Sequence, residues 1–181
     1  MNWILTHSGL QFDFLNPTAA MISPRDIAHS LARLCRFNGH THTHYSVAQH
    51  SLLVCELVPR KDQLPALIHD ATEAYLGDMT SPLKALVPEY RKIEQRVWYA
   101  ICERFDIDPV LPESVKRADI VTLATERRDL MPLHPDKWEC LRGIPAMPDR
   151  ITPLPAEVAS MRFFSRLMEL MQRDHRQRMS S

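Results

Sequence analysis

The dipeptide His69-Asp70 is the feature of this chain with the clearest potential for chemistry. It lies in a stretch whose other residues are typical of a protein core: Leu64, Ala66, Leu67, Ile68, Ala71 and Ala74. Burying an ionised carboxylate is costly unless a hydrogen bond, a cation or a metal ion compensates its charge. The identity of that partner therefore decides whether this segment belongs to a catalytic centre.

Two more residues, His50 and Asp119, extend the pair to a set of two imidazoles and two carboxylates. Each residue alone also has a structural explanation, such as a histidine bonded to a carbonyl or Asp119 paired with Arg117 or Arg128. Together the nitrogen and oxygen donors suit one divalent cation, with cobalt, manganese, zinc, nickel and magnesium as candidates. Such a set leaves positions free for other oxygen ligands. The predicted metal ligands are His50, His69, Asp70 and Asp119.

Helices are predicted to position this set. Ser23-Pro24 is a typical start signal, and the apolar residues after it repeat at helical spacing to about Arg36. Ser46 is expected to cap a second helix, which carries His50. Both helices would have one apolar face that packs on a common core.

A third helix is predicted to begin at Asp62, to carry His69 and Asp70, and to end before Gly77. A final amphipathic helix is expected to be followed by a basic tail that frays. The remaining predicted helices, of which the second carries Asp119, cover residues 88–105, 112–131 and 156–173.

The fold class predicted from these patterns is all-α, a helical bundle. Residues 3–14 are the exception, because two short apolar runs around a turn-like link predict a small β-hairpin. Residues 132–155 are rich in proline and lack a periodic pattern, so we expect an ordered loop. No internal repeat or linker divides the chain, which indicates one domain over residues 1–181.

The composition limits the classes of partner and compartment. The 22 basic and 22 acidic residues of this 181-residue chain balance, so no surface for a nucleic acid polymer is expected. The four cysteines lie far apart without a Cys-x-x-Cys pair, which indicates reduced thiols. No apolar run approaches the roughly 20 residues of a membrane span, and the N-terminus lacks a signal-peptide pattern. We therefore expect a cytoplasmic protein that does not contact a membrane.

Four segments, taken in order, resemble the HD-domain phosphohydrolase superfamily, within its branch of bacterial 5′-deoxynucleotidases and phage deoxynucleoside triphosphatases. They are Val47-Ala48-Gln49-His50-Ser51, His69-Asp70-Ala71-Thr72-Glu73-Ala74, Gly77-Asp78-Met79-Thr80-Ser81-Pro82-Leu83-Lys84 and Lys116-Arg117-Ala118-Asp119. The resemblance covers about residues 25–130. It implies an all-helical fold in which a His, a His-Asp pair and a distal Asp bind the metal ion.

The resemblance also implies catalytic roles for two acidic residues. Glu73 follows His69 by one turn on the same face of the predicted helix, and it corresponds to the general acid or base of the family. Asp78 comes directly after Gly77, where the chain can turn back, and it matches an acid near the attacking water. The structural alternatives are an exposed helix carboxylate for Glu73 and a loop cap for Asp78.

Phosphate binding is expected from Arg36, which together with Phe37 resembles an arginine–aromatic pair of the 5′-deoxynucleotidases. In those enzymes the arginine holds the phosphate, and the aromatic ring packs near the sugar and helps to exclude ribose. This chain has Phe37 where the best-matching relatives often carry tryptophan. Lys84, expected in a turn, is a second candidate for phosphate binding, with a solvated surface lysine as the alternative.

The resemblance implies a metal-dependent phosphohydrolase that converts deoxynucleoside 5′-monophosphates to nucleoside and phosphate. One alternative is a deoxynucleoside triphosphate triphosphohydrolase of phage type that prefers dATP. Another is a non-catalytic, metal-dependent regulator that binds nucleotides. A regulator would not need Glu73 or Asp78, whose presence favours an enzyme. Relatives commonly assemble, so a homo-oligomer, a dimer or larger, is expected.

The run His40-Thr41-His42-Thr43-His44 has two interpretations. Alternation would place three imidazoles on one side of an extended segment and make a second metal site. We favour a polar loop beside the active site, with one histidine reaching phosphate or capping Ser46. Near the C-terminus, a group of large apolar residues is interpreted as core packing or an oligomer interface: Met161, Leu167, Met168, Leu170 and Met171.

Overall fold

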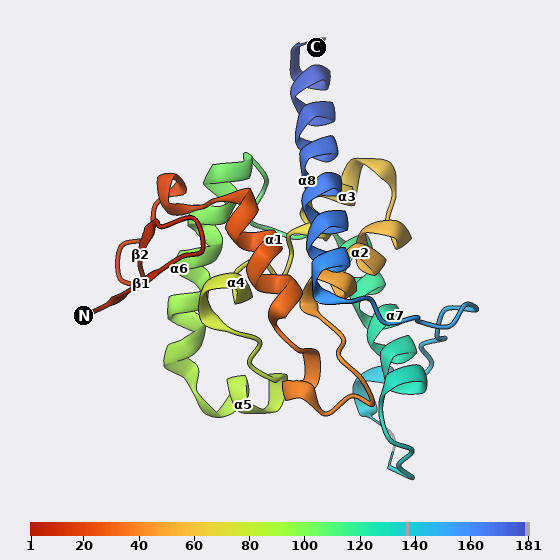
Figure 1. Ribbon diagram of the computed structural model, residues 1–181. Coiled ribbons are helices and arrows are strands. Elements are labelled where there is room, and N and C mark those ends of the chain that lie inside the picture. The colour runs from red at the N-terminus through yellow and green to blue at the C-terminus, as the bar shows by residue number, and fades with distance from the viewer. Residues whose placement is uncertain (137, 180–181) are drawn as a thin grey trace.

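The computed structural model describes residues 1–136 and 138–179, and it is mostly helical (Figure 1). A small antiparallel sheet comes first, in which β1 (Trp3–Leu5) pairs with β2 (Gln11–Asp13). The α-helices of the described residues are α1 Pro24–Arg33, α2 Val47–Leu57, α3 Gln63–Leu67, α4 Glu73–Leu76, α5 Ser81–Leu86, α6 Pro88–Phe105, α7 Glu113–Leu130 and α8 Ala156–Met179. Short 3-10 segments are η1 Ala19–Met21, η2 Arg36–Gly39, η3 Arg60–Asp62 and η4 Glu139–Leu141. The predicted all-α class with an N-terminal hairpin is confirmed.

Helices α1 and α2 are the centre of the bundle. Helix α1 packs along α8 and also contacts α2 and α4, while α2 contacts α3, α7 and α8. Figure 1 shows α1 and α8 side by side, with the last turns of α8 extending beyond the body. Helix α6 lies on the other side of the molecule, next to the hairpin and in contact with η1.

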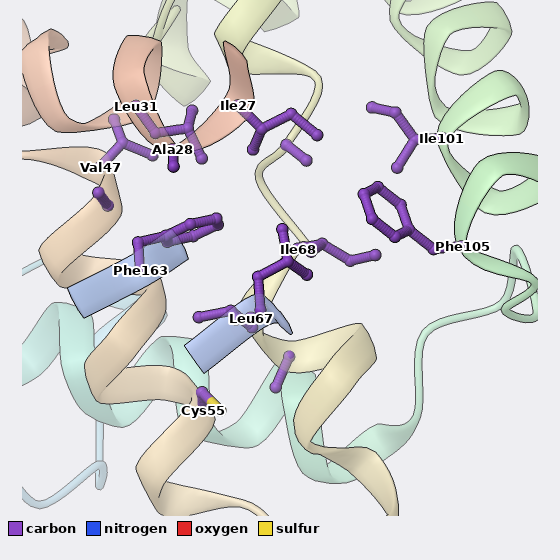
Figure 2. Close-up of a cluster of buried hydrophobic side chains, with 14 of the residues drawn as sticks. Ile27, Ala28, Leu31, Val47, Cys55, Leu67, Ile68, Ile101, Phe105 and Phe163 are labelled. Atoms are coloured by element: carbon purple, nitrogen blue, oxygen red, sulfur yellow. The ribbon is translucent and has the colours of Figure 1, made fainter. Parts of the chain in front are cut away.

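One hydrophobic core joins these elements and extends from Phe12 in the hairpin to Leu170 in α8. Figure 2 shows its central part, where side chains of α1, α2, α6 and α8 meet those of the segment around Ile68. Phe163 of α8 is fully buried against this cluster. None of the helices in the described residues combines the length and the apolar character that a membrane span requires.

Several helix boundaries agree with the sequence. The Ser23 hydroxyl accepts a hydrogen bond from the backbone N–H of Asp26, and the Ser46 hydroxyl accepts one from that of Gln49. Both serines therefore satisfy backbone donors that the first turn of a helix leaves free. Helix α6 has the predicted bounds, and α7 is one residue shorter at each end than predicted. Helix α4 ends before Gly77, which has a positive φ of 82°.

The prediction of one continuous helix from Asp62 to Gly77 is wrong. Helix α3 ends at Leu67, residues 68–72 form turns, and α4 begins only at Glu73. The Ala66 carbonyl, which a continuous helix would offer to the backbone of Asp70, accepts a hydrogen bond from His69 Nδ1 at 2.8 Å. Because of this contact and the tighter turns that follow, the His-Asp pair lies between two short helices rather than on one.

Three further boundaries differ from the sequence prediction. Helix α1 ends at Arg33 because residues 34–36 pair with 45–47, through an antiparallel bridge and backbone hydrogen bonds. The segment that carries Lys84 is helix α5 instead of a turn, since proline is accepted in its first turn. Helix α8 continues to Met179, beyond the predicted end at Arg173, whose guanidinium donates to the Arg60 carbonyl and to Gln63.

The proline-rich segment 132–155 is irregular apart from η4, as predicted, although position 137 lies outside the described residues. Its second half is bound firmly to the helices. The Gln49 side-chain amide donates to the Thr152 carbonyl and its oxygen accepts from Leu154 N–H, each at 2.8 Å. The backbone N–H of Met147 donates to Thr125 Oγ1, which fixes the segment on α7.

Replacing Phe163 with Ala should lower the free energy of unfolding by about 3–5 kcal/mol, because a fully buried ring leaves a cavity in the core. Chemical denaturation measures this loss. Met161→Ala, on the same helix but with 64% of the residue exposed, should change the free energy by no more than about 0.5 kcal/mol. Equal effects of the two substitutions would contradict this description of the core.

Candidate metal centre

His50 lies in the first turns of α2 and is fully buried. Its Nδ1 is 2.7 Å from Glu126 Oε1. An ionised carboxylate only accepts hydrogen bonds, so Nδ1 carries the proton and Nε2 points toward the centre. Burial and the charge of Arg36 lower the pKa of His50, but Glu126 and Asp119 outweigh them and raise this pKa to about 10. The surroundings of Nε2 therefore attract a cation.

His69 and Asp70 reach the same point from the turn between α3 and α4. The hydrogen bond from His69 Nδ1 to the Ala66 carbonyl fixes the proton on Nδ1. The lone pair of Nε2 is therefore available to bind a metal ion. Burial alone would raise the pKa of Asp70, but His69, His50 and Arg36 hold it well below its usual range. The carboxylate is thus ionised beside two imidazoles.

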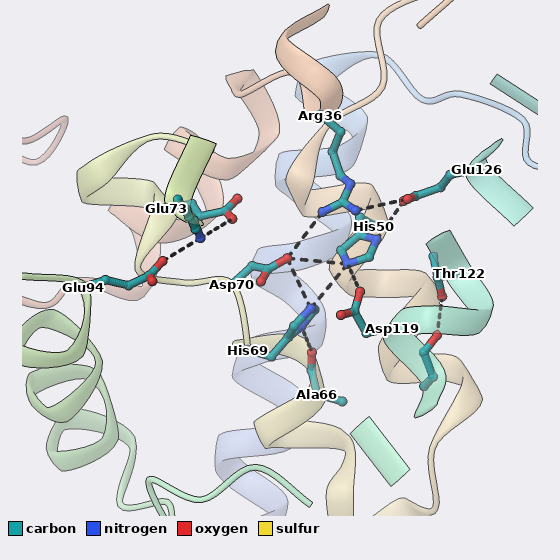
Figure 3. Close-up of polar contacts among 12 residues, drawn as sticks. Arg36, His50, Ala66, His69, Asp70, Glu73, Glu94, Asp119, Thr122 and Glu126 are labelled. Atoms are coloured by element: carbon teal, nitrogen blue, oxygen red, sulfur yellow. Dashed lines mark hydrogen bonds and ion pairs between the residues drawn. The ribbon is translucent and has the colours of Figure 1, made fainter. Parts of the chain in front are cut away.

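These side chains and Asp119 of α7 converge (Figure 3). His50 Nε2 lies 3.3 Å from His69 Nε2 and 3.2 Å from Asp119 Oδ1. Asp70 Oδ2 lies 3.2 Å from His69 Nε2 and 3.5 Å from His50 Nε2. His50, His69 and Asp119 each offer one donor atom within 4.8 Å of the others, so this group could hold a metal ion.

The donor set passes a test of its fit to a metal ion. The raised pKa of His50 places a proton on its Nε2 when no cation is present, and that proton can be shared with His69 Nε2, 3.3 Å away. A bound metal ion would take the place of this proton. Ligands bound about 2.1 Å from one ion are about 3.0–3.4 Å from their neighbours, which is close to the observed 3.2–3.5 Å separations. The spacing of these atoms therefore fits a metal ion bound among them.

Glu126 and Arg36 form a charged contact directly behind the centre. Arg36 Nη2 donates to Glu126 Oε2 at 3.1 Å, and Arg36 Nη1 lies 3.6 Å from Asp70 Oδ2. Glu126 is fully buried, and burial would raise its pKa, but Arg36 and His50 lower it. A carboxylate that orients a metal-binding histidine through its other nitrogen is a common outer partner in metal sites.

Glu126 was not among the residues predicted from the sequence. The signal that could have indicated it is its place on α7, two helical turns after Asp119 and so on the same face of the helix. Arg36 was predicted to bind phosphate, and the structure places its guanidinium beside Asp70, at the edge of the centre. Phe37 follows it with its ring 5.3 Å from the Arg36 Cζ atom.

Glu73 is buried at the start of α4, and not exposed as the structural alternative supposed. Its Oε2 is buried without a hydrogen-bond partner in the described part of the chain, and its Oε1 lies 4.0 Å from Lys84 Nζ. Burial and the charges of Asp70 and Asp78 raise the pKa of Glu73 well above its usual range. Asp78 is half-buried, and burial raises its pKa too. The Lys84 ammonium also contacts Glu94, at 2.7 Å.

The histidine run does not form a second metal group within the residues that the structure describes. His44 Nδ1 lies 3.3 Å from Cys35 Sγ, and His44 Nε2 lies 3.3 Å from the Ala32 carbonyl. The backbone N–H of His42 donates to the Leu130 carbonyl, and His40 is exposed. The run is a loop near Arg36, as favoured from the sequence, and its contacts hold that loop in place.

Comparison with known proteins gives two similar chains, while no protein-family model matches. The chain is 46% identical over 148 residues to uncharacterized protein YfdR of Escherichia coli (strain K12), an alignment that covers 81% of this chain and 82% of YfdR. The chain belongs to the YfdR family. A second similar protein is uncharacterized protein RCAP_rcc00048 of Rhodobacter capsulatus. It is 44% identical to this chain over 126 residues, and the alignment covers 64% of its length.

Removal of one metal-ligating side chain should abolish tight metal binding, because the remaining ligands cannot enclose the ion. We expect His69→Ala and Asp119→Asn to lose measurable binding of Mn²⁺ or Co²⁺ in isothermal titration calorimetry. Glu126→Gln keeps the shape of the side chain but loses its charge, and it should weaken binding by about 10–100-fold.

The matched control is His134→Ala, since His134 is an exposed histidine in the 132–155 segment. It should bind the metal ion as the unaltered protein does. Unchanged affinity in both His69→Ala and Asp119→Asn would show that this group is not the metal site.

Proposed function

We propose that the protein is a metal-dependent phosphohydrolase of the HD-domain type that hydrolyses deoxynucleoside 5′-monophosphates to nucleoside and phosphate. The observation that carries the proposal is the group of two imidazole Nε2 atoms and the carboxylates of Asp70 and Asp119, with Arg36 and the buried Glu73 beside it. The resemblance of the four sequence segments to that superfamily supports the same reaction.

His50, His69, Asp70 and Asp119 would hold the cation. When bound, a divalent cation supplies Lewis acidity, which polarises a phosphoryl oxygen and makes a water molecule more acidic. The protein's own part is to keep the four side chains in place. Glu126 orients His50 and the Ala66 carbonyl orients His69 through their Nδ1 atoms, so that both Nε2 atoms point toward the position of the ion.

Arg36 supplies positive charge for the phosphate group. Its guanidinium is bound to Glu126 and lies near Asp70, while its Nε is buried without a hydrogen-bond partner in the described residues. Arg36 Nη1, 3.6 Å from Asp70 Oδ2, is the group that would donate to a phosphate oxygen, and charge-assisted bonds of this kind are strong. Lys84 Nζ, near Glu73, adds a second positive charge on the side of α5.

Glu73 is suited to move the proton that the reaction requires. Hydrolysis breaks the bond between phosphorus and the ester oxygen, and that oxygen needs a proton to leave as a hydroxyl group. Burial and the charge of Asp70 raise the pKa of Glu73 and so favour its protonated form, which can donate a proton to the leaving oxygen. The water that attacks phosphorus releases a proton, and this proton restores the protonated form of Glu73 for the next cycle.

A panel of nucleotides distinguishes this proposal from its alternatives. Protein stripped with a chelator and reloaded with Mn²⁺ or Co²⁺ should release inorganic phosphate from deoxynucleoside 5′-monophosphates, and the stripped protein should not. Release of tripolyphosphate from dATP would instead favour a triphosphohydrolase. Binding of nucleotides without any product would favour a regulator and contradict the enzymatic function.

Glu73→Gln should reduce kcat by about 10²–10⁴-fold, because the amide cannot donate the proton to the leaving oxygen. Calorimetry should show metal binding within about twofold of the unaltered protein, since Glu73 is not among the donors. The control is Glu89→Gln, an exposed glutamate of α6 paired with Lys92, which should keep full activity. An unchanged kcat in Glu73→Gln would exclude the catalytic role.

A further inference from the structure

The backbone directly after Arg36 is strained. Phe37 (φ 54°, ψ 34°) and Asn38 (φ 51°, ψ 29°) both adopt the left-handed conformation, which is unfavourable for residues with a side chain and especially for a bulky ring. Such strain is found mostly where surrounding contacts enforce it for a function. Phe37 lies outside the hydrophobic core cluster and is half-buried, so core packing does not explain its conformation.

A tryptophan from a distant part of the chain meets this ring. Trp138, which precedes η4, has its ring centroid 6.1 Å from that of Phe37, and the two planes are inclined by 44°. Inclined rings at this distance do not cover each other as stacked rings do. Trp138 is also half-buried and outside the core cluster. Each ring therefore keeps a face that its aromatic neighbour leaves uncovered.

A guanidinium lies over each ring of this aromatic pair. Arg36 Cζ is 5.3 Å from the centre of the Phe37 ring, and Arg127 Cζ is 5.2 Å from that of Trp138. Arg127 also donates a hydrogen bond to the Asp136 carbonyl, which fixes it next to the segment that carries Trp138. The four side chains form a row, Arg36–Phe37–Trp138–Arg127, whose first member is at the metal centre.

We propose that Trp138 stacks on the nucleobase of the substrate, so that the protein selects nucleotides over phosphate esters without a base. This inference rests on the proposed function. The order of the row would match the order of groups in a nucleotide: the phosphate at Arg36 beside the metal centre, the sugar at Phe37, and the base on the face of Trp138 opposite Arg127. Aromatic side chains with nearby guanidinium groups are the usual platform for base stacking, which accepts any base.

The structure allows a test that leaves the fold intact. Thr125, Asp129 and Gln49 hold the second half of the 132–155 segment through hydrogen bonds to positions 147–154. Trp138 takes no part in these bonds. Substitution of Trp138 should therefore not release the segment from the helices. Circular dichroism and the thermal midpoint of each variant check this point.

Fluorescence measures the stacking directly and does not require turnover. The chain has three tryptophans, so Trp3→Phe and Trp98→Phe in a Glu73→Gln background leave Trp138 as the single emitter. In the zinc-loaded protein, deoxyadenosine 5′-monophosphate should quench this emission to saturation, and 2-deoxyribose 5-phosphate should not. Equal quenching by both, or by neither, would overturn the proposal even if the protein hydrolyses phosphate esters.

Kinetics separates stacking from a merely structural role. Trp138→Ala should raise KM for deoxyadenosine 5′-monophosphate about tenfold, the size expected for one lost base stack, and should leave KM for 2-deoxyribose 5-phosphate within about twofold. Trp138→Phe should recover most of the loss, and Trp98→Phe is the control. A parallel change for both substrates, or no change for either, would show that Trp138 does not recognise the base.

Discussion

The buried carboxylate of Glu126 is the interaction on which the centre depends. It accepts hydrogen bonds from Arg36 in η2 and from His50 in α2, while its own backbone belongs to α7. A fully buried charge is tolerated only with such partners, and removal of one typically costs about 3–5 kcal/mol. The segment η2 and the helices α2 and α7 must therefore pack together at Glu126. As a result, His50 Nε2 and the Arg36 guanidinium both lie next to Asp70.

The regular structure is interrupted where the functional side chains lie. His69 and Asp70 occupy turns between two short helices, and Arg36 begins a segment that continues with two left-handed residues. These interruptions are unfavourable by themselves, and the surrounding core compensates for them. A cation bound among the donor atoms around His50 Nε2 would balance the charges of Asp70 and Asp119, so metal binding and local stability would be coupled.

The sequence was sufficient for the elements with strong local signals. The caps at Ser23 and Ser46 and the bounds of α6 follow from side chains within one turn of the boundary. His50 and Asp119 could be grouped with His69 because few other side chains that can bind a metal ion occur in the apolar helical stretches of the sequence. In contrast, the end of α3 depends on the His69 ring bonding to the Ala66 carbonyl, which periodicity does not report. Glu126 and Trp138 escaped detection because their partners, Arg36 and Phe37, are about a hundred residues away in the chain.

Anomalous diffraction from crystals of the manganese-loaded protein would locate the metal ion that we propose among His50, His69, Asp70 and Asp119. We expect one strong peak per chain at the manganese absorption edge, in contact with Nε2 of His50, Nε2 of His69 and the carboxylates of Asp70 and Asp119. A peak elsewhere in the molecule, or binding through Nδ1 of either histidine, would contradict it.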